Sequence, residues 1–166
     1  MKLQIDEDSP KVEFPPPLFV LICMLGSWMM HSVVPISINI SRPVANFLGF
    51  TSLGIGFGLI FTCVFLFKTN NTNIQPWKTT SCIIKTGPYS YSRNPIYLGM
   101  LILQFAVTLF LRSYIGILFL LFLLGFLRFF VIQNEEEYLT EKFGSEYTEY
   151  QKRVTRWLTS KHKERK

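Results

Sequence analysis

The chain contains, at residues 95–132, the sequence PIYLGMLILQFAVTLFLRSYIGILFLLFLLGFLRFFVI. This stretch divides into two apolar runs, residues 95–111 and 114–132, each close to the length of about 20 residues that a helix needs to cross a bilayer. Only Arg112 and Ser113 separate the two runs, so the stretch predicts a tight hairpin of two membrane-spanning helices.

Two further apolar runs precede this hairpin, at residues 18–34 and 44–67. A short link, residues 35–43, joins them, and a long polar link, residues 68–94, leads to the hairpin. A buried soluble core would not need four such runs in a chain of 166 residues. We therefore expect a single all-α domain, residues 1–166, that is a polytopic helical membrane protein with about four transmembrane helices.

The basic residues are divided unevenly between the two sides of this arrangement. Of the Lys and Arg outside the spans, 14 lie in the N-terminal segment, the long link and the C-terminal tail, and only Arg42 and Arg112 lie on the opposite side. Since basic residues favour the cytoplasmic side, both termini and the long link are predicted to be cytoplasmic. The membrane would be the bacterial inner membrane or that of the endoplasmic reticulum.

The net charge of +6 indicates attraction to anionic lipids. No basic stripe interleaved with aromatic residues indicates a nucleic-acid partner. Acidic residues and a proline run stand before the first span, so no cleavable signal peptide is expected. Cys23, Cys63 and Cys82 show no paired spacing, and we expect neither a disulfide nor a metal site.

Two features inside the spans have both a structural and a functional interpretation. The glycine string at residues 54–58, G-x-G-x-G, lies in an apolar span, where small residues favour close helix packing over phosphate binding. Arg128 costs at least about 2.5 kcal/mol inside a bilayer unless it faces a partner or a cavity. It either shares a helix face with Glu135 and Glu136, two turns further on, or extends to the cytoplasmic rim.

Polar segments flank the hairpin on both sides. Before it stands TGPYSYSRNPIYLG, residues 86–99, and after it stands EEEYLTEKFGSEYTEYQKRVTRW, residues 135–157. Asn94 suits a helix N-cap and Pro95 the first helical position, and the open backbone at such an N-terminus suits an anion. The acidic residues 135–137 suit a cation, an amine or ribose hydroxyls. Alternatively, both segments are ordinary turns beside the membrane.

Together the two segments resemble a family of integral membrane methyltransferases that includes isoprenylcysteine carboxyl methyltransferases and phospholipid N-methyltransferases. The resemblance covers residues 85–157 and two ordered motifs separated by the hairpin. The matching residues are Gly87, Pro88, Tyr89, Arg93, Pro95, Tyr97 and Gly99 in the first motif and Glu135, Glu136, Leu139, Phe143, Gly144, Tyr147 and Tyr150 in the second.

The resemblance implies S-adenosylmethionine as cofactor, bound at the cytoplasmic rim, and a lipid substrate that enters from the bilayer. The implied reaction is methyl transfer to a lipidic or membrane-partitioned acceptor, either an isoprenylcysteine-type carboxylate or a phospholipid amine. Arg93, paired with a carboxylate, and Glu136 are the candidate catalytic residues, and Arg128 is a candidate for substrate binding. The expected cofactor-binding residues are Lys85, Thr86, Gly87, Pro88, Tyr89, Asn94, Pro95, Tyr97, Gly99, Glu135 and Glu136.

Asn94 departs from the family pattern, which usually has histidine there. Asparagine keeps a capping role, but it cannot take up a proton. An ionised carboxylate or thiolate needs no base before methylation, whereas an ammonium head group does. The departure therefore favours an anionic acceptor; alternatively, Glu136 is the base, or the chain has lost activity.

The segment after Glu135 is predicted to form an amphipathic cytoplasmic helix, with a possible break at Gly144. It would act as a surface anchor or as a lid over the site. Its apolar residues recur at helical spacing and are Leu139, Phe143, Tyr147, Tyr150, Val154 and Trp157.

Two other functions remain open from the sequence. Membrane sterol reductases share a similar glycine-proline-tyrosine and arginine-histidine-proline pattern but use NADPH, and they are usually longer, with more spans. A non-catalytic membrane scaffold that keeps the fold is the other alternative, and Asn94 gives it some support.

Overall fold

A computed structural model describes residues 6–12 and 14–158 of the chain. Its helices are α1 (Pro16–Val33), α2 (Arg42–Thr69), the short 3-10 helix η1 (Gly87–Ser90), α3 (Pro95–Leu111), α4 (Tyr114–Phe126), the π-helical segment η2 (Leu127–Ile132), α5 (Gln133–Phe143) and α6 (Ser145–Arg153). Within the described residues the only β-type pairing is an isolated bridge between Ser37 and Ser113. The predicted all-α fold is confirmed.

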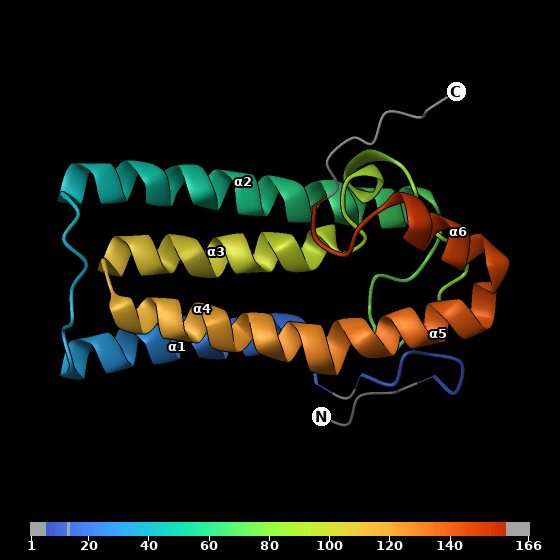
Figure 1. Cartoon of the computed structure of the whole chain (residues 1–166), viewed down its shortest axis with the longest axis horizontal. Helices are drawn as coiled ribbons and strands as arrows, with labels where there is room; N and C mark the ends of the chain where they lie inside the picture. Colours follow the sequence, from blue (N-terminus) through green and yellow to red (C-terminus); the bar gives the residue numbers. More distant parts are fainter. Residues whose placement is uncertain (1–5, 13, 159–166) are drawn as a thin grey trace.

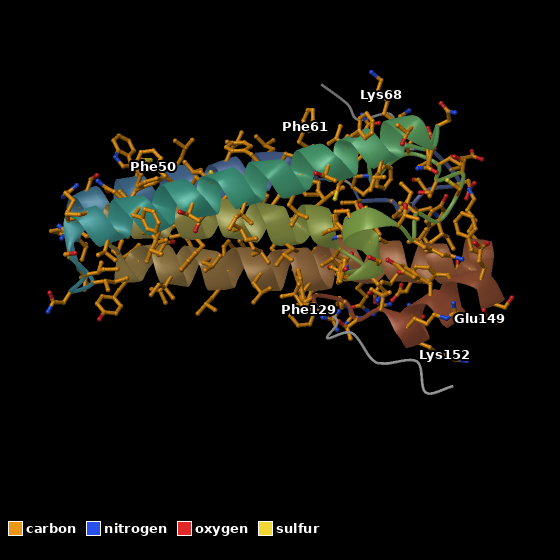
Figure 2. All side chains as sticks on the ribbon, turned by 90° about the horizontal axis from the view of Figure 1, so that it is seen from above. Phe50, Phe61, Lys68, Phe129, Glu149 and Lys152 are labelled. Carbon is orange, nitrogen blue, oxygen red and sulfur yellow. The ribbon has the colours of Figure 1, made fainter. Side chains whose placement is uncertain are left out.

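The four long apolar helices form a bundle in which α3 occupies the middle (Figure 1). α3 packs against α1, α2 and α4, whereas α2 contacts the bundle mainly through α3. Most of α2 therefore faces outward, and Phe50 and Phe61 project from it into the surroundings (Figure 2). Exposed phenylalanines over a whole helix suit contact with lipid tails rather than with water.

Among the described residues, three helices are long and apolar enough to cross a bilayer: Pro16–Val33, Arg42–Thr69 and the continuous helix Tyr114–Phe143. The central helix α3 has the expected bounds but only 17 residues, which at 1.5 Å per residue is about 26 Å. The other helices begin at or within two residues of the expected starts. The last one does not end near residue 132, because η2 continues it directly into α5.

The tight hairpin between α3 and α4 depends on two residues. Arg112 ends α3 in a left-handed conformation with φ 49°, and the Ser113 hydroxyl accepts a hydrogen bond from the Gly116 amide at 3.3 Å to begin α4. The Arg112 Nη1 also donates to the Ile40 carbonyl at 3.1 Å, which joins the hairpin to the link between α1 and α2. Both connections consequently lie at the same end of the bundle (Figure 1).

The opposite end carries the long link, residues 70–94, together with α5, α6 and the described terminal segments 6–12 and 154–158 (Figure 1). This is the grouping of segments on which the charge asymmetry depends. Some of the basic residues counted in it lie outside the described residues, namely Lys2, Lys161, Lys163, Arg165 and Lys166. Which side of the membrane this end faces stays a prediction.

The glycine string of α2 divides into two kinds of position. A Cβ atom at Gly56 would lie 3.1 Å from the Gly99 carbonyl oxygen of α3, so close helix packing is confirmed there. Gly54 and Gly58 have nothing within 4 Å of such an atom and face open space. The contact is mutual, since a Cβ atom at Gly99 would lie 3.1 Å from the Gly56 carbonyl oxygen.

Candidate active site

An open pocket of about 770 Å³, its mouth included, lies at the end of the bundle that carries both polar motifs. The long link, the two motifs, the end of α2 and the N-terminal segment all contribute to its wall. The lining residues are Pro10, Phe67, Asn73, Ile74, Gln75, Pro76, Thr80, Cys82, Ile83, Ile84, Tyr89, Arg93, Asn94, Ile96, Tyr97, Glu135, Glu136, Leu139, Tyr147 and Tyr150.

The first motif reaches the pocket through the 3-10 turn η1. Gly87 begins this turn with φ 61°, a conformation that favours glycine. The turn buries Tyr89, whose carbonyl accepts a 2.6 Å hydrogen bond from the Tyr150 hydroxyl of α6. The two motifs therefore contact each other directly at the pocket wall.

Asn94 occupies the N-cap of α3 as expected, but its side chain makes no capping hydrogen bond. The Ser92 hydroxyl accepts from the Asn94 backbone amide at 3.1 Å. The Asn94 Nδ2 instead donates to the Arg156 carbonyl in the C-terminal tail, at 3.1 Å. The N-cap position of Asn94 is thus confirmed, but a capping bond to its side-chain oxygen is not formed, and the side-chain nitrogen is bonded to the tail.

Arg93 is the buried cation of the pocket, with a side chain only 11% exposed. Its Nη2 contacts the Glu136 Oε1 at 3.2 Å. Its Nε and Nη1 are buried and have no hydrogen-bond partner among the described residues. Unpaired buried donors on a guanidinium are costly, so these nitrogens are suited to receive an anion from a ligand.

The three consecutive glutamates have different environments. Glu136 is 8% exposed and contacts two arginines, Arg93 and Arg156. Glu135 accepts a 2.5 Å hydrogen bond from the Tyr97 hydroxyl of α3. Glu137 is exposed and accepts a 3.2 Å hydrogen bond from the nearby Gln133 side chain. Two of the three carboxylates therefore belong to the pocket, as the second motif predicts.

The tail packs onto the protein through its apolar residues. Gly144, with φ 53°, separates α5 from α6, so the expected break is confirmed. The apolar cluster that follows consists of Tyr147, Tyr150 and Val154 packed against Ile83, Leu139 and Phe143. Burial raises the pKa of Tyr147 to about 12, so its hydroxyl stays protonated at neutral pH. The tail thus closes one side of the pocket.

Several expected site residues lie outside the pocket lining. Lys85 is exposed and pairs with Glu146 at 2.8 Å. Arg128 lies in η2 and lines a separate open groove, with its guanidinium carbon 5.6 Å from the Phe129 ring centroid. The remaining ones form the turn or the start of α3: Thr86, Gly87, Pro88, Pro95 and Gly99.

Sequence reasoning missed two contributions to the site. The link residues 73–84 form one wall of the pocket, and no motif marks them. Arg156 is not among the expected site residues, but it contacts Glu136 through its Nε at 2.9 Å and through its Nη2. Its position directly before Trp157, at the end of the second motif, was the available signal.

Fold and pocket together define a helical membrane protein with a polar, arginine- and carboxylate-lined site at one end of its bundle. Comparison of the sequence with family models gives the particular family. The model described as phospholipid methyltransferase matches residues 44–146, and the chain belongs to this family. The resemblance noted from the two motifs is thereby confirmed, and the chain is an integral membrane protein of a methyltransferase family.

Two relatives extend the comparison. The chain is similar to Protein-S-isoprenylcysteine O-methyltransferase of Saccharomyces cerevisiae, with 28% identity over 139 residues, 81% of this chain and 57% of the yeast protein. It is also similar to an uncharacterized protein of Haemophilus influenzae, with 38% identity over 63 residues, 38% of this chain and 100% of that protein. The chain thus spans little more than half the length of its yeast relative.

Proposed function

We propose that this protein transfers a methyl group from S-adenosylmethionine to a lipidic or membrane-partitioned acceptor at the cytoplasmic membrane face. The observation that carries the proposal is Arg93, whose Nε and Nη1 are buried without a partner among the described residues. The same pocket holds Glu135 and lies largely within the segment that matches the family. An anion-binding group and a carboxylate in one pocket suit a ligand that carries both an anionic and a cationic part.

The residues present fit this cofactor. The pocket combines charged and apolar side chains in its lining, as small-molecule sites usually do. Arg93 would hold a carboxylate, and Glu135 would hold the amino group or the ribose hydroxyls. When bound, S-adenosylmethionine supplies an electrophilic methyl group on a sulfonium. Phe67, Ile96 and Leu139 provide apolar wall beside these polar groups.

The role of the chain in such a transfer is positioning and exclusion of water. Holding two reacting groups in line removes much of the entropic cost of their encounter. The tail and the long link enclose the pocket from two sides, which limits access of water to the reacting groups. Arg128, in the neighbouring groove that also contains Glu136, remains our candidate for contact with the acceptor.

The hydrogen bonds around Asn94 and Glu136 bear on the acceptor. Asn94 cannot accept a proton, and its amide is occupied by the Arg156 carbonyl. Arg156 contacts both oxygens of Glu136, and Arg93 contacts one of them. The position at which the family usually has histidine therefore supplies no general base, and an acceptor that is already ionised needs none. We propose an isoprenylcysteine-type carboxylate in preference to a phospholipid amine.

Calorimetry on the detergent-purified protein tests this function. We expect S-adenosylhomocysteine to bind and NADPH not to bind. Binding of NADPH alone would indicate a reductase, and binding of neither would indicate a scaffold. Glu135→Ala removes the carboxylate proposed for the amino group or the ribose hydroxyls and should abolish binding of S-adenosylhomocysteine, whereas Glu137→Ala, at an exposed position, should leave it unchanged. Equal affinities of the Glu135 variant and the parent would refute the site.

A further inference from the structure

The C-terminal tail is fixed to the start of α3 at residues 155–156. The Arg93 backbone amide donates to the Thr155 carbonyl at 3.1 Å. The Arg156 carbonyl accepts two hydrogen bonds, from the Asn94 Nδ2 at 3.1 Å and from the Ser92 hydroxyl at 3.3 Å. The backbone of Arg156 is therefore held beside the first motif, although it lies about 60 residues further along the chain.

The side chain of Arg156 reaches across to α5. Its Nε donates to the Glu136 Oε1 at 2.9 Å, and its Nη2 donates to the Glu136 Oε2. This fork occupies both carboxylate oxygens, the strongest arrangement between these two groups. The interaction raises the pKa of Arg156 above its usual value, since both the hydrogen bond and the negative charge favour the cation.

Arg93 has only a single contact with the same carboxylate. Its Nη2 lies 3.2 Å from the Glu136 Oε1, an oxygen that also accepts from Arg156. A carboxylate whose two oxygens are held by one guanidinium cannot form the same fork with a second one. This geometry leaves the Nε and Nη1 of Arg93 without a partner among residues 6–12 and 14–158.

We infer that Arg156 is a positioning residue: by holding Glu136 in a fork, it keeps Nε and Nη1 of Arg93 free of Glu136, so that one of them can bind the carboxylate of a ligand. Asn94 supports this role, because its side-chain amide donates to the Arg156 carbonyl and has no proton to gain or lose near neutral pH. The inference rests on the proposed function, and the carboxylate belongs either to the amino-acid part of the cofactor or to the acceptor. Without Arg156, Glu136 is free to turn toward Arg93 and occupy those donors.

The test compares Arg156→Gln with the parent protein, full length and in detergent. S-adenosylhomocysteine carries the amino-acid carboxylate, and 5′-methylthioadenosine lacks it. If the carboxylate is the cofactor's, the affinity for S-adenosylhomocysteine falls about tenfold or more, in line with a lost charged hydrogen bond, and the affinity for 5′-methylthioadenosine is unchanged. If it is the acceptor's, both affinities are unchanged, and the KM for N-acetyl-S-farnesylcysteine rises about tenfold with little change in kcat.

Two outcomes overturn the inference. One is an equal loss of affinity for both nucleosides, which would give Arg156 a general structural role. The other is no change in either affinity or in KM. Failure of S-adenosylhomocysteine to bind the parent protein would instead refute the proposed function itself, which keeps the two failures distinguishable.

Further variants secure the comparison. Arg156→Lys keeps the charge but not the fork, and should show a smaller loss of the same selectivity; it carries the test if Arg156→Gln does not fold. Asn94→Asp removes the donor to the Arg156 carbonyl and should reproduce the selective loss in part. Arg153→Gln is the matched control, because this side chain is 79% exposed and its contact with the Glu149 carboxylate is long, at 4.0 Å.

Discussion

Replacing Glu136 by glutamine removes the one carboxylate that two guanidinium groups share. The side chains of Arg93 and Glu136 are 11% and 10% exposed, and that of Arg156 is 29% exposed. Loss of one member of a buried ion pair leaves its partner uncompensated and typically costs 3–5 kcal/mol. Since Arg156 retains some solvent, we expect the lower end of this range, a loss of about 3 kcal/mol in the free energy of unfolding.

Arg156→Gln removes the other side of the fork but leaves Glu136 paired with Arg93. Its expected cost is therefore smaller, about 1.5 kcal/mol, the value of a hydrogen bond to a charged group. In the double variant no uncompensated Arg156 cation remains. We expect the two losses to overlap, so that the double variant is destabilised by about 3 kcal/mol rather than by their sum.

Unfolding of the four proteins in detergent, followed by far-ultraviolet circular dichroism, gives the double-mutant cycle. A coupling energy of at least about 1 kcal/mol is expected for residues in direct contact. Glu149→Gln combined with Arg153→Gln serves as the control, because these side chains are exposed and 4.0 Å apart. Strict additivity of the Glu136 and Arg156 losses would show that the fork does not exist in solution.

Three other outcomes are expected. Gly56→Ala places a Cβ 3.1 Å from the α3 backbone and should cost about 1–3 kcal/mol in thermal unfolding, while Gly58→Ala, with open space around it, should cost far less. The pKa of Tyr147 is raised to about 12, so the stability that its protonated hydroxyl contributes is complete below the ordinary pKa near 10 and is lost as the pH rises toward 12. Tyr147→Phe should reduce this loss of stability at high pH. An unchanged loss would contradict the burial of Tyr147. Asp8→Asn breaks an exposed 2.5 Å ion pair with Lys142 and should lower stability by less than about 1 kcal/mol, an effect that 0.5 M salt should mimic in the parent protein.

The hairpin was predictable in detail because its determinants are local. Apolar runs set the length of α3 and the start of α4, and Arg112 with Ser113 left no room for a longer connection. The first motif was predictable for a similar reason, since Gly87 and Pro95 fix the backbone within a few residues. In each of these cases the physical cause lies within one turn of the residue concerned.

The contacts that complete the pocket depend on residues far apart in the chain. Asn94 has the same capping preference wherever it stands, and only the folded tail shows that its amide serves Arg156 instead. In the sequence Arg156 resembles the other basic residues of the tail, because its contact with Glu136 forms only in the folded chain. No motif marks the wall formed by residues 73–84, because these residues line the pocket through their position in the fold and not through a particular type of side chain.

The π-helical segment Leu127–Ile132 joins the apolar part of the last long helix to the part that carries Glu135 and Glu136. A π turn bonds residue i to i+5 and thus holds one residue more than an α turn. Deleting one residue within this segment would be absorbed by a return to ordinary α winding, whereas deleting one residue from α4 would rotate everything beyond it by about 100°. Glu135 and Glu136 would then leave the pocket without any change in their identity. The number of residues in α4 therefore decides whether the two carboxylates face the pocket. One apolar residue of α4 can replace another, but the helix cannot lose a residue without moving the site.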